Sequence, residues 1–170
     1  LKMLRRYIGE HVGILFKPDG SDTRFVGSAV QVEQLIMNLC INARDAIENV
    51  GKITVKTHES VRTASEVSER PGILPGEYAV LEVSDTGCGM DSNTVGHLFE
   101  PFFTTKSVGK GSGLGLATIY GIVRQNNGFI DVSSKPGLGS TFRIHLPVYP
   151  GDAVEEPARE NSPIDVGGRE

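Results

Sequence analysis

The chain has 170 residues, 38 % of them apolar and 22 % charged, which suits one globular domain with a substantial core. Its net charge of −4 and the lack of a basic stripe argue against a general nucleic-acid binder. Two cysteines build no disulfide framework and favour a reducing compartment. With no run of transmembrane length and no signal-peptide pattern, we expect a cytoplasmic domain without membrane contact.

The first half of the chain predicts two short strands followed by a long helix. Residues 11–17 and 23–26 have strand character, and Ser28 is a suitable N-cap for a helix that runs to about Asn49. Gly51 follows and is expected to end the helix. The apolar residues of this helix recur at helical spacing, and they are Val32, Leu35, Ile36, Leu39, Cys40, Ala43 and Ile47.

The second half predicts mainly antiparallel strands and one helix. The expected elements are a strand around 53–57, an exposed hairpin loop over 61–75, a strand over 78–85, a helix over 117–125, and strands containing 130–132 and 142–146 joined by a turn at 135–139. This order favours an α+β fold, a two-layer α/β sandwich with a mixed, mostly antiparallel sheet packed against helices. The domain is expected to span residues 1–148. Residues 149–170 lack periodicity and are expected to form a disordered tail or linker.

The glycine-rich run at 111–116 precedes the predicted helix at 117–125. A glycine-rich turn that opens a helix directs unpaired N–H groups and the positive end of the helix dipole at a ligand, which suits phosphate. Two common glycine motifs do not fit. The sixth position, Leu116, is neither Gly nor Ala as in a Rossmann turn, and position 104 lacks the first glycine of a P-loop.

The predicted long helix carries a polar stripe. Asn38, Asn42 and Asp45 lie at i, i+4 and i+7, about a third of a turn from the centre of the apolar face. Any one of them alone is best explained as part of a solvated face. Three together at the rim of the core favour a pocket wall, where an Asn oxygen can bind Mg²⁺.

A buried carboxylate is predicted at the end of the strand over 78–85. Asp85 shares parity with Leu81 and Val83, so its side chain points to the apolar side and requires a donor, such as an adenine amino group. Gly87 and Gly89 would let the turn pass close to a flat ring. Taken alone, the segment is better explained as an ordinary Asp-x-Gly turn after a strand.

As an ordered set, these motifs resemble the ATP-binding catalytic domain of sensor histidine kinases, within the Bergerat-fold (GHKL) superfamily. Residues 38–46 resemble the N box of that family, 85–90 and 111–116 its two glycine boxes, 98–103 its F box, and 139–142 a short motif on a late strand.

The resemblance implies roles for individual residues. Asn42 would bind Mg²⁺ with Asn38 on the phosphate side, Asp85 would bind the adenine amine, and Lys106 would hold phosphates under a mobile lid at 104–112. The full expected ATP site comprises Asn38, Asn42, Asp45, Asp85, Gly87, Gly89, Met90, Thr105, Lys106, Gly111, Ser112, Gly113, Leu114, Gly115, Leu116 and Thr141.

Asn38 indicates the type of reaction. Hydrolytic members of the superfamily, such as gyrase and the mismatch-repair ATPases, carry at this place a Glu that activates water, and Asn38 cannot act as a general base. The resemblance therefore implies a kinase that supplies the γ-phosphoryl group of ATP to a histidine. None of the four histidines fits the family's acceptor motif, so we expect no phosphoacceptor or other catalytic residue here and a dimerisation hairpin before Leu1.

The expected partners are that hairpin and the receiver domain of a response regulator in two-component signalling. The tail ending at Glu170 resembles the linker before a receiver domain in hybrid kinases. Three alternatives stay open, namely a hydrolytic ATPase, a protein-serine kinase of the anti-sigma-factor type, and a degenerate domain that only binds a partner.

Overall fold

A five-stranded sheet forms the centre of the computed structural model, which describes residues 2–20, 25, 27–106 and 111–148. The strands are β1 (Val12–Pro18), β2 (Gly51–Arg62), β3 (Gly76–Asp85), β4 (Phe129–Ser134) and β5 (Ser140–Pro147), in the spatial order β1-β2-β3-β5-β4. Strand β1 runs parallel to β2, and every other neighbouring pair is antiparallel. The predicted mixed, mostly antiparallel sheet is confirmed.

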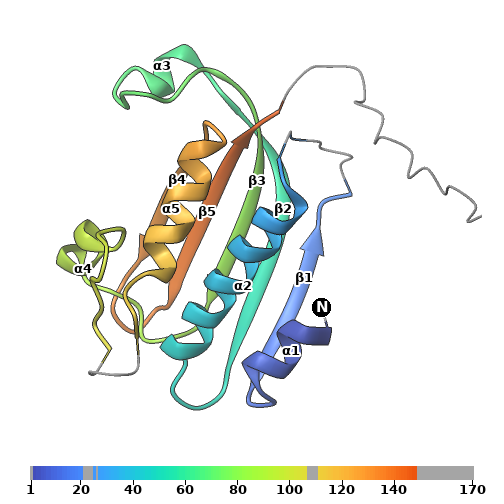
Figure 1. Ribbon diagram of the computed structural model, residues 1–170, viewed down its shortest axis with the longest axis vertical. Coiled ribbons are helices and arrows are strands. Elements are labelled where there is room, and N and C mark those ends of the chain that lie inside the picture. Colours follow the sequence, from blue (N-terminus) through green and yellow to red (C-terminus); the bar gives the residue numbers. More distant parts are fainter. Residues whose placement is uncertain (1, 21–24, 26, 107–110, 149–170) are drawn as a thin grey trace, which may run out of the picture.

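Helices α1 (Lys2–Ile8), α2 (Ala29–Ala46) and α5 (Gly115–Gln125) provide the second layer (Figure 1). The core lies between this layer and the sheet, and its most deeply buried members include Leu35, Leu39, Cys40, Ile53, Val83, Ile119, Val123 and Ile144. The apolar periodicity of α2 and the alternation along the strands both point into this core. The two-layer α+β sandwich predicted from the sequence is therefore confirmed.

The end of α2 differs from the prediction. The helix follows Ser28 as expected but stops at Ala46, and Ile47 has extended backbone with a buried side chain. Gly51 does not cap the helix, because it is the first residue of β2. A Cβ atom on Gly51 would lie 2.7 Å from Ile47 Cγ2, so the glycine permits close packing at the start of the strand.

The predicted hairpin loop contains a helical turn. Strand β2 extends to Arg62, and α3 (Ala64–Val67) follows within the connection to β3. Thr63 caps α3 through a reciprocal bond with Glu66, whose side chain accepts from the Thr63 backbone N–H at 2.8 Å. The Thr-x-x-Glu pattern was visible in the sequence, so treating 61–75 as loop alone was wrong.

Other expectations concern the ends of the described ranges. Of the strand expected at 23–26, only Phe25 is described, and it forms an isolated antiparallel bridge with Val148. The expected tail at 149–170 lies outside the described residues. Helix α1 was not anticipated, and it buries Leu4 and Ile8 against the core.

Within the described ranges, no helix combines the length and apolarity needed to span a bilayer.

The sheet face opposite the helices carries a charged cluster around a buried histidine. His145 alternates with the core residue Ile144 along β5, yet it is only 1 % exposed because its ring stacks on Phe129 at 4.2 Å between centroids. Its Nε2 lies 3.2 Å from Asp131 Oδ2, and Arg70 Nη1 contacts Asp131 Oδ1 at 2.5 Å. The His145 ring and the Arg70 guanidinium lower the pKa of Asp131 to about 2, although burial opposes them.

This cluster should stabilise the fold in a pH-dependent way. A lowered carboxyl pKa stabilises the protein above the ordinary value of 3.8, and the contribution disappears as pH falls from 3.8 toward about 2. We expect Asp131→Asn to reduce the free energy of unfolding by about 1 kcal/mol at neutral pH, since the side chain is partly exposed. Urea titrations across this pH range should show wild type and variant converging in acid. The exposed Glu69→Gln is the control, and a pH-independent difference would contradict the assignment.

Candidate functional site

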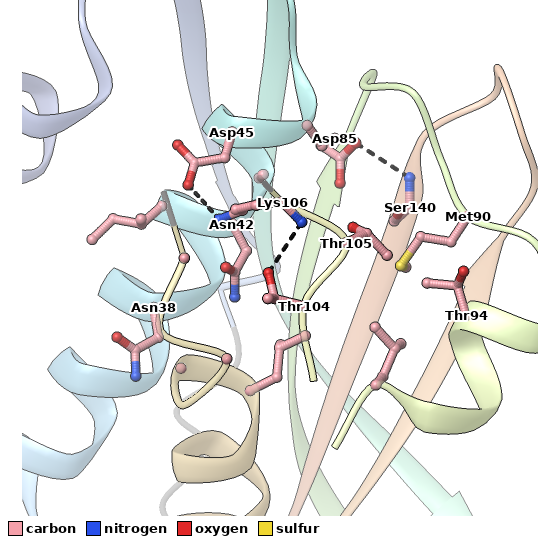
Figure 2. Close-up of a pocket in the computed structure, with 18 of the residues that line it drawn as sticks. Asn38, Asn42, Asp45, Asp85, Met90, Thr94, Thr104, Thr105, Lys106 and Ser140 are labelled. Carbon is pink, nitrogen blue, oxygen red and sulfur yellow. Dashed lines mark hydrogen bonds and ion pairs between the residues drawn. The ribbon is translucent and has the colours of Figure 1, made fainter. Parts of the chain in front are cut away.

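A cavity of about 460 Å³ opens beside α2, between the end of β3 and the segment that leads into α5 (Figure 2). Its volume lies within the usual range for small-molecule sites. Among the expected site residues, those that line it are Asn38, Asn42, Asp45, Asp85, Gly89, Met90, Thr105, Lys106, Gly111, Ser112, Gly113, Gly115 and Leu116. The structure thus brings together the polar stripe of α2, the turn after Asp85 and the glycine-rich run at 111–116, which lie far apart in the sequence.

The polar stripe of α2 forms one wall. Asn38, Asn42 and Asp45 all face the cavity along successive turns of the helix (Figure 2). The amide nitrogen of Asn42 is buried and has no hydrogen-bond partner among the described residues. A buried amide nitrogen without a partner is uncommon, so this donor of Asn42 is available to an acceptor on a ligand.

Asp85 lies at another side of the cavity with a largely buried carboxyl group, since the residue is 9 % exposed. Its Oδ1 accepts from the backbone N–H of Gly87 at 2.8 Å and of Ser140 at 3.3 Å. Burial raises the pKa of Asp85, although these two hydrogen bonds oppose the rise. Both donors reach the same oxygen, which leaves Oδ2 to accept from a ligand.

The glycines beside Asp85 allow neighbouring backbone segments to approach closely. A Cβ atom on Gly89 would lie 1.9 Å from the Lys135 carbonyl oxygen, and one on Gly87 would lie 2.5 Å from that of Ala46. The backbone of Cys88 bonds to the same two neighbouring segments, donating to Ala46 and accepting from Gly137. These contacts clamp the turn between α2 and the β4–β5 hairpin. Gly89 lines the cavity and Gly87 does not, and the expectation that these glycines admit a ring stays a prediction.

The second glycine run shapes the opposite side. Gly113 has φ +67° and packs against the backbone of Phe102, whose N–H donates to the Gly113 carbonyl at 3.0 Å. Helix α5 begins at Gly115 without a side-chain cap, and Gly115 lines the cavity. Its first-turn N–H groups therefore suit an anion. The expected lid at 104–112 includes 107–110, which lie outside the described residues.

Lys106 is already engaged at the cavity rim. Its Nζ donates to Asp45 Oδ2 at 2.5 Å, and Arg44 also binds Asp45 (Figure 2). The backbone N–H of Lys106 donates to Thr104 Oγ1 at 3.1 Å, which fixes the local turn. The cavity thus contains a cation that is held by a neighbouring carboxylate.

The lining of the cavity differs from the expected site at several residues. Leu114 does not line the cavity, and neither does Thr141, whose hydroxyl bonds to Ser84 at 3.0 Å on the opposite sheet face. Side chains alternate along a strand, so Ser140 and Phe142 take the place predicted for Thr141. Ser140 shares parity with Phe142, and this signal was available in the sequence. The cavity-lining residues that were also not predicted include Ile41, Arg44, Cys88 and Thr94.

Comparison with known proteins places this architecture in a family. A family model described as histidine kinase-, DNA gyrase B-, and HSP90-like ATPase matches residues 27–150. The chain belongs to this family. The resemblance to the ATP-binding domain of sensor histidine kinases is thereby confirmed, and curated relatives carry the same kind of name.

Those relatives are longer proteins. Sensor kinase CckA of Brucella abortus is 42 % identical over 134 residues, which cover 79 % of this chain and 14 % of CckA. The sensory histidine kinase/phosphatase NtrB of Rhodobacter capsulatus is 35 % identical over 143 residues, covering 84 % of this chain and 39 % of NtrB. The chain thus spans well under half the length of either relative.

Solved structures show the same fold. The mycobacterial sensor histidine kinase MprB matches with a TM-score of 0.64 at 23 % identity, covering 88 % of this chain and 89 % of the solved MprB chain. Full-length ShkA, solved in complex with AMPPNP, matches with a TM-score of 0.66 at 20 % identity, covering 89 % of this chain and 28 % of ShkA.

The clamp around Asp85 predicts different effects of two glycine substitutions. Gly139 and Gly137 have nearly equal φ values, +78° and +77°, but only a Cβ on Gly139 would meet backbone, at 2.0 Å from the Asp85 carbonyl oxygen. We expect Gly139→Ala to lower the free energy of unfolding by at least about 2 kcal/mol more than Gly137→Ala. Urea unfolding followed by circular dichroism measures both, and equal losses would contradict the close approach.

Proposed function

We propose that this domain binds ATP with Mg²⁺ and supplies the γ-phosphoryl group for phosphorylation of a histidine on an upstream dimerisation hairpin. The observation that carries the proposal is the division of one cavity into two chemically distinct sides. Asp85 lies near Ser140 and Met90 on one side, and the two asparagines of α2 lie with Lys106 on the other (Figure 2). A nucleotide has the same division between its base and its phosphates.

The Asp85 side suits an adenine ring. The free carboxylate oxygen matches the exocyclic amino group of adenine, which is a donor. Apolar side chains in the lining, among them Met90, Leu98 and Phe142, suit the faces of the ring. A guanine would place a carbonyl oxygen at the corresponding position and repel the carboxylate, so the arrangement favours adenine.

The α2 side suits phosphates with Mg²⁺. Mg²⁺ prefers oxygen ligands, few of them from the protein, with phosphate and water completing its shell. Asn42, with Asn38 one turn away, brings a carboxamide oxygen of this kind to the cavity, and its buried amide nitrogen, which has no partner among the described residues, would donate to a phosphate oxygen. Mg²⁺ would neutralise negative charge on the phosphate oxygens, while Lys106 and the N-terminus of α5 would hold them.

The residues in the cavity favour transfer over hydrolysis. Asn38 occupies the wall where a general base would activate water, and an amide cannot take up that proton. Phosphoryl transfer depends mainly on positioning and charge neutralisation, so the nucleophile can come from another domain. The acceptor histidine, the response-regulator receiver domain that takes the group next, and a cytoplasmic location where ATP is supplied are parts of this proposal.

The assignment of Asp85 predicts a selective loss of nucleotide binding. Asp85→Asn keeps the shape but turns an amide donor or a weaker acceptor toward the adenine amine. We expect ADP and ATP to bind at least about tenfold more weakly in titration calorimetry. The fold should persist, because the amide removes a buried charge. Exposed Glu48→Gln is the control, and unchanged affinity in Asp85→Asn would refute the assignment.

The proposed division of labour predicts binding without self-labelling. Incubated with Mg²⁺ and γ-labelled ATP, the chain should bind nucleotide yet acquire no acid-labile label. Label on the chain would show an acceptor within it. Steady ATP hydrolysis that is abolished by Asn42→Ala would instead favour the hydrolytic alternative.

A further inference from the structure

A continuous chain of contacts runs along the cavity rim from α1 to the segment before α5. Arg44 Nη1 donates to the carbonyl oxygen of Tyr7 at 2.7 Å, in the last turn of α1. The same guanidinium donates through Nε to Asp45 Oδ1 at 2.8 Å. The other oxygen, Oδ2, accepts from Lys106 Nζ at 2.5 Å (Figure 2). Each oxygen of Asp45 therefore has its own cationic partner.

The pair between Asp45 and Lys106 lies partly enclosed. Their side chains are 22 % and 33 % exposed, so solvent screens the pair less than an ion pair on an open surface. Burial would raise the pKa of Asp45, but the hydrogen bonds from Lys106 and Arg44 lower it overall. The carboxylate is thus ionised at neutral pH.

We propose that Asp45 is a positioning residue that holds the Lys106 ammonium group at the cavity rim until a nucleotide phosphate replaces it. The inference rests on the proposed function, since it requires phosphate in this cavity. Asp45 and phosphate are both anions that line or enter the same space, so they repel each other and compete for the same ammonium group. Phosphate, with more charge, wins the exchange when nucleotide is bound.

Arg44 makes this exchange possible without leaving Asp45 unpaired. The Tyr7 carbonyl holds the guanidinium from the other side, at a helix C-terminus where a cation is favourable. When Lys106 departs, Asp45 retains Arg44 as its partner. Through its hydrogen bonds to Tyr7 and Asp45, Arg44 also links α1 to the carboxylate that competes with phosphate.

The test compares the binding of ATP with that of adenosine, which lacks the phosphate groups. Asp45→Asn frees Lys106, so ATP should bind about fivefold more tightly at low salt, while adenosine affinity stays unchanged. In the Lys106→Gln background, Asp45→Asn should raise ATP affinity much less than it does in wild type, because there is no ammonium group to release. Glu48→Gln, which removes a carboxylate that does not line the cavity, is the charge-matched control.

Each alternative result overturns a different statement. If Asp45→Asn leaves ATP affinity unchanged or weakens it, while wild type binds ATP and adenosine, the exchange is refuted and the proposed function stands. A gain that persists in full with Lys106→Gln also refutes the exchange, because it reports only relieved repulsion. If wild type binds neither ATP nor adenosine, the proposed function fails and this inference fails with it.

Discussion

The site depends on how the end of β3 is held. Asp85 closes that strand with a carboxyl group that is buried and bonded to two backbone N–H groups, one from its own turn and one from the start of β5. Gly139 allows the β4–β5 hairpin to approach the Asp85 backbone, and Gly89 allows the following turn to approach Lys135. Three segments thus meet with almost no space for side chains. The position of the Asp85 carboxyl group in the cavity wall therefore follows from close backbone packing, which leaves it little freedom to move.

Charge is separated between the two faces of the sheet. On the face opposite the helices, Glu82 is paired with Arg143 of the neighbouring strand, and Asp131 is paired with Arg70 from the connection between β2 and β3. On the cavity side, Asn42 has an unpaired amide nitrogen among the described residues and Lys106 is paired with a side chain it can leave. Satisfied groups stabilise, whereas groups left unpaired or exchangeably paired are available to a ligand. The cavity thus combines an amide donor that lacks a partner among the described residues with a lysine whose side-chain partner, Asp45, also lines the cavity.

Local sequence patterns predicted much of the cavity wall, whereas the features that were missed depend on contacts between residues far apart in the sequence. Helical spacing placed Asn38, Asn42 and Asp45 on one wall, and strand parity placed Asp85 inside. The same parity applied to β5 would have selected Ser140 over Thr141. By contrast, the pairing of Lys106 with Asp45 joins residues 61 positions apart, and the burial of His145 depends on stacking with a neighbouring strand. Neither has a local periodic signal, because both arise only when the sheet and helices assemble.

The two sides of the cavity are therefore built from different interactions. Around Asp85, glycines and backbone hydrogen bonds set the geometry, and no side chain has to move for a donor to reach the carboxylate. Around Asp45, three flexible charged side chains set it, and their partners can change at modest free-energy difference because they are partly exposed. A rigid side favours selection of one base by shape and hydrogen bonding. On the proposed function, phosphate groups change in charge and number during transfer, and a side whose ion pairs can exchange partners accommodates that change.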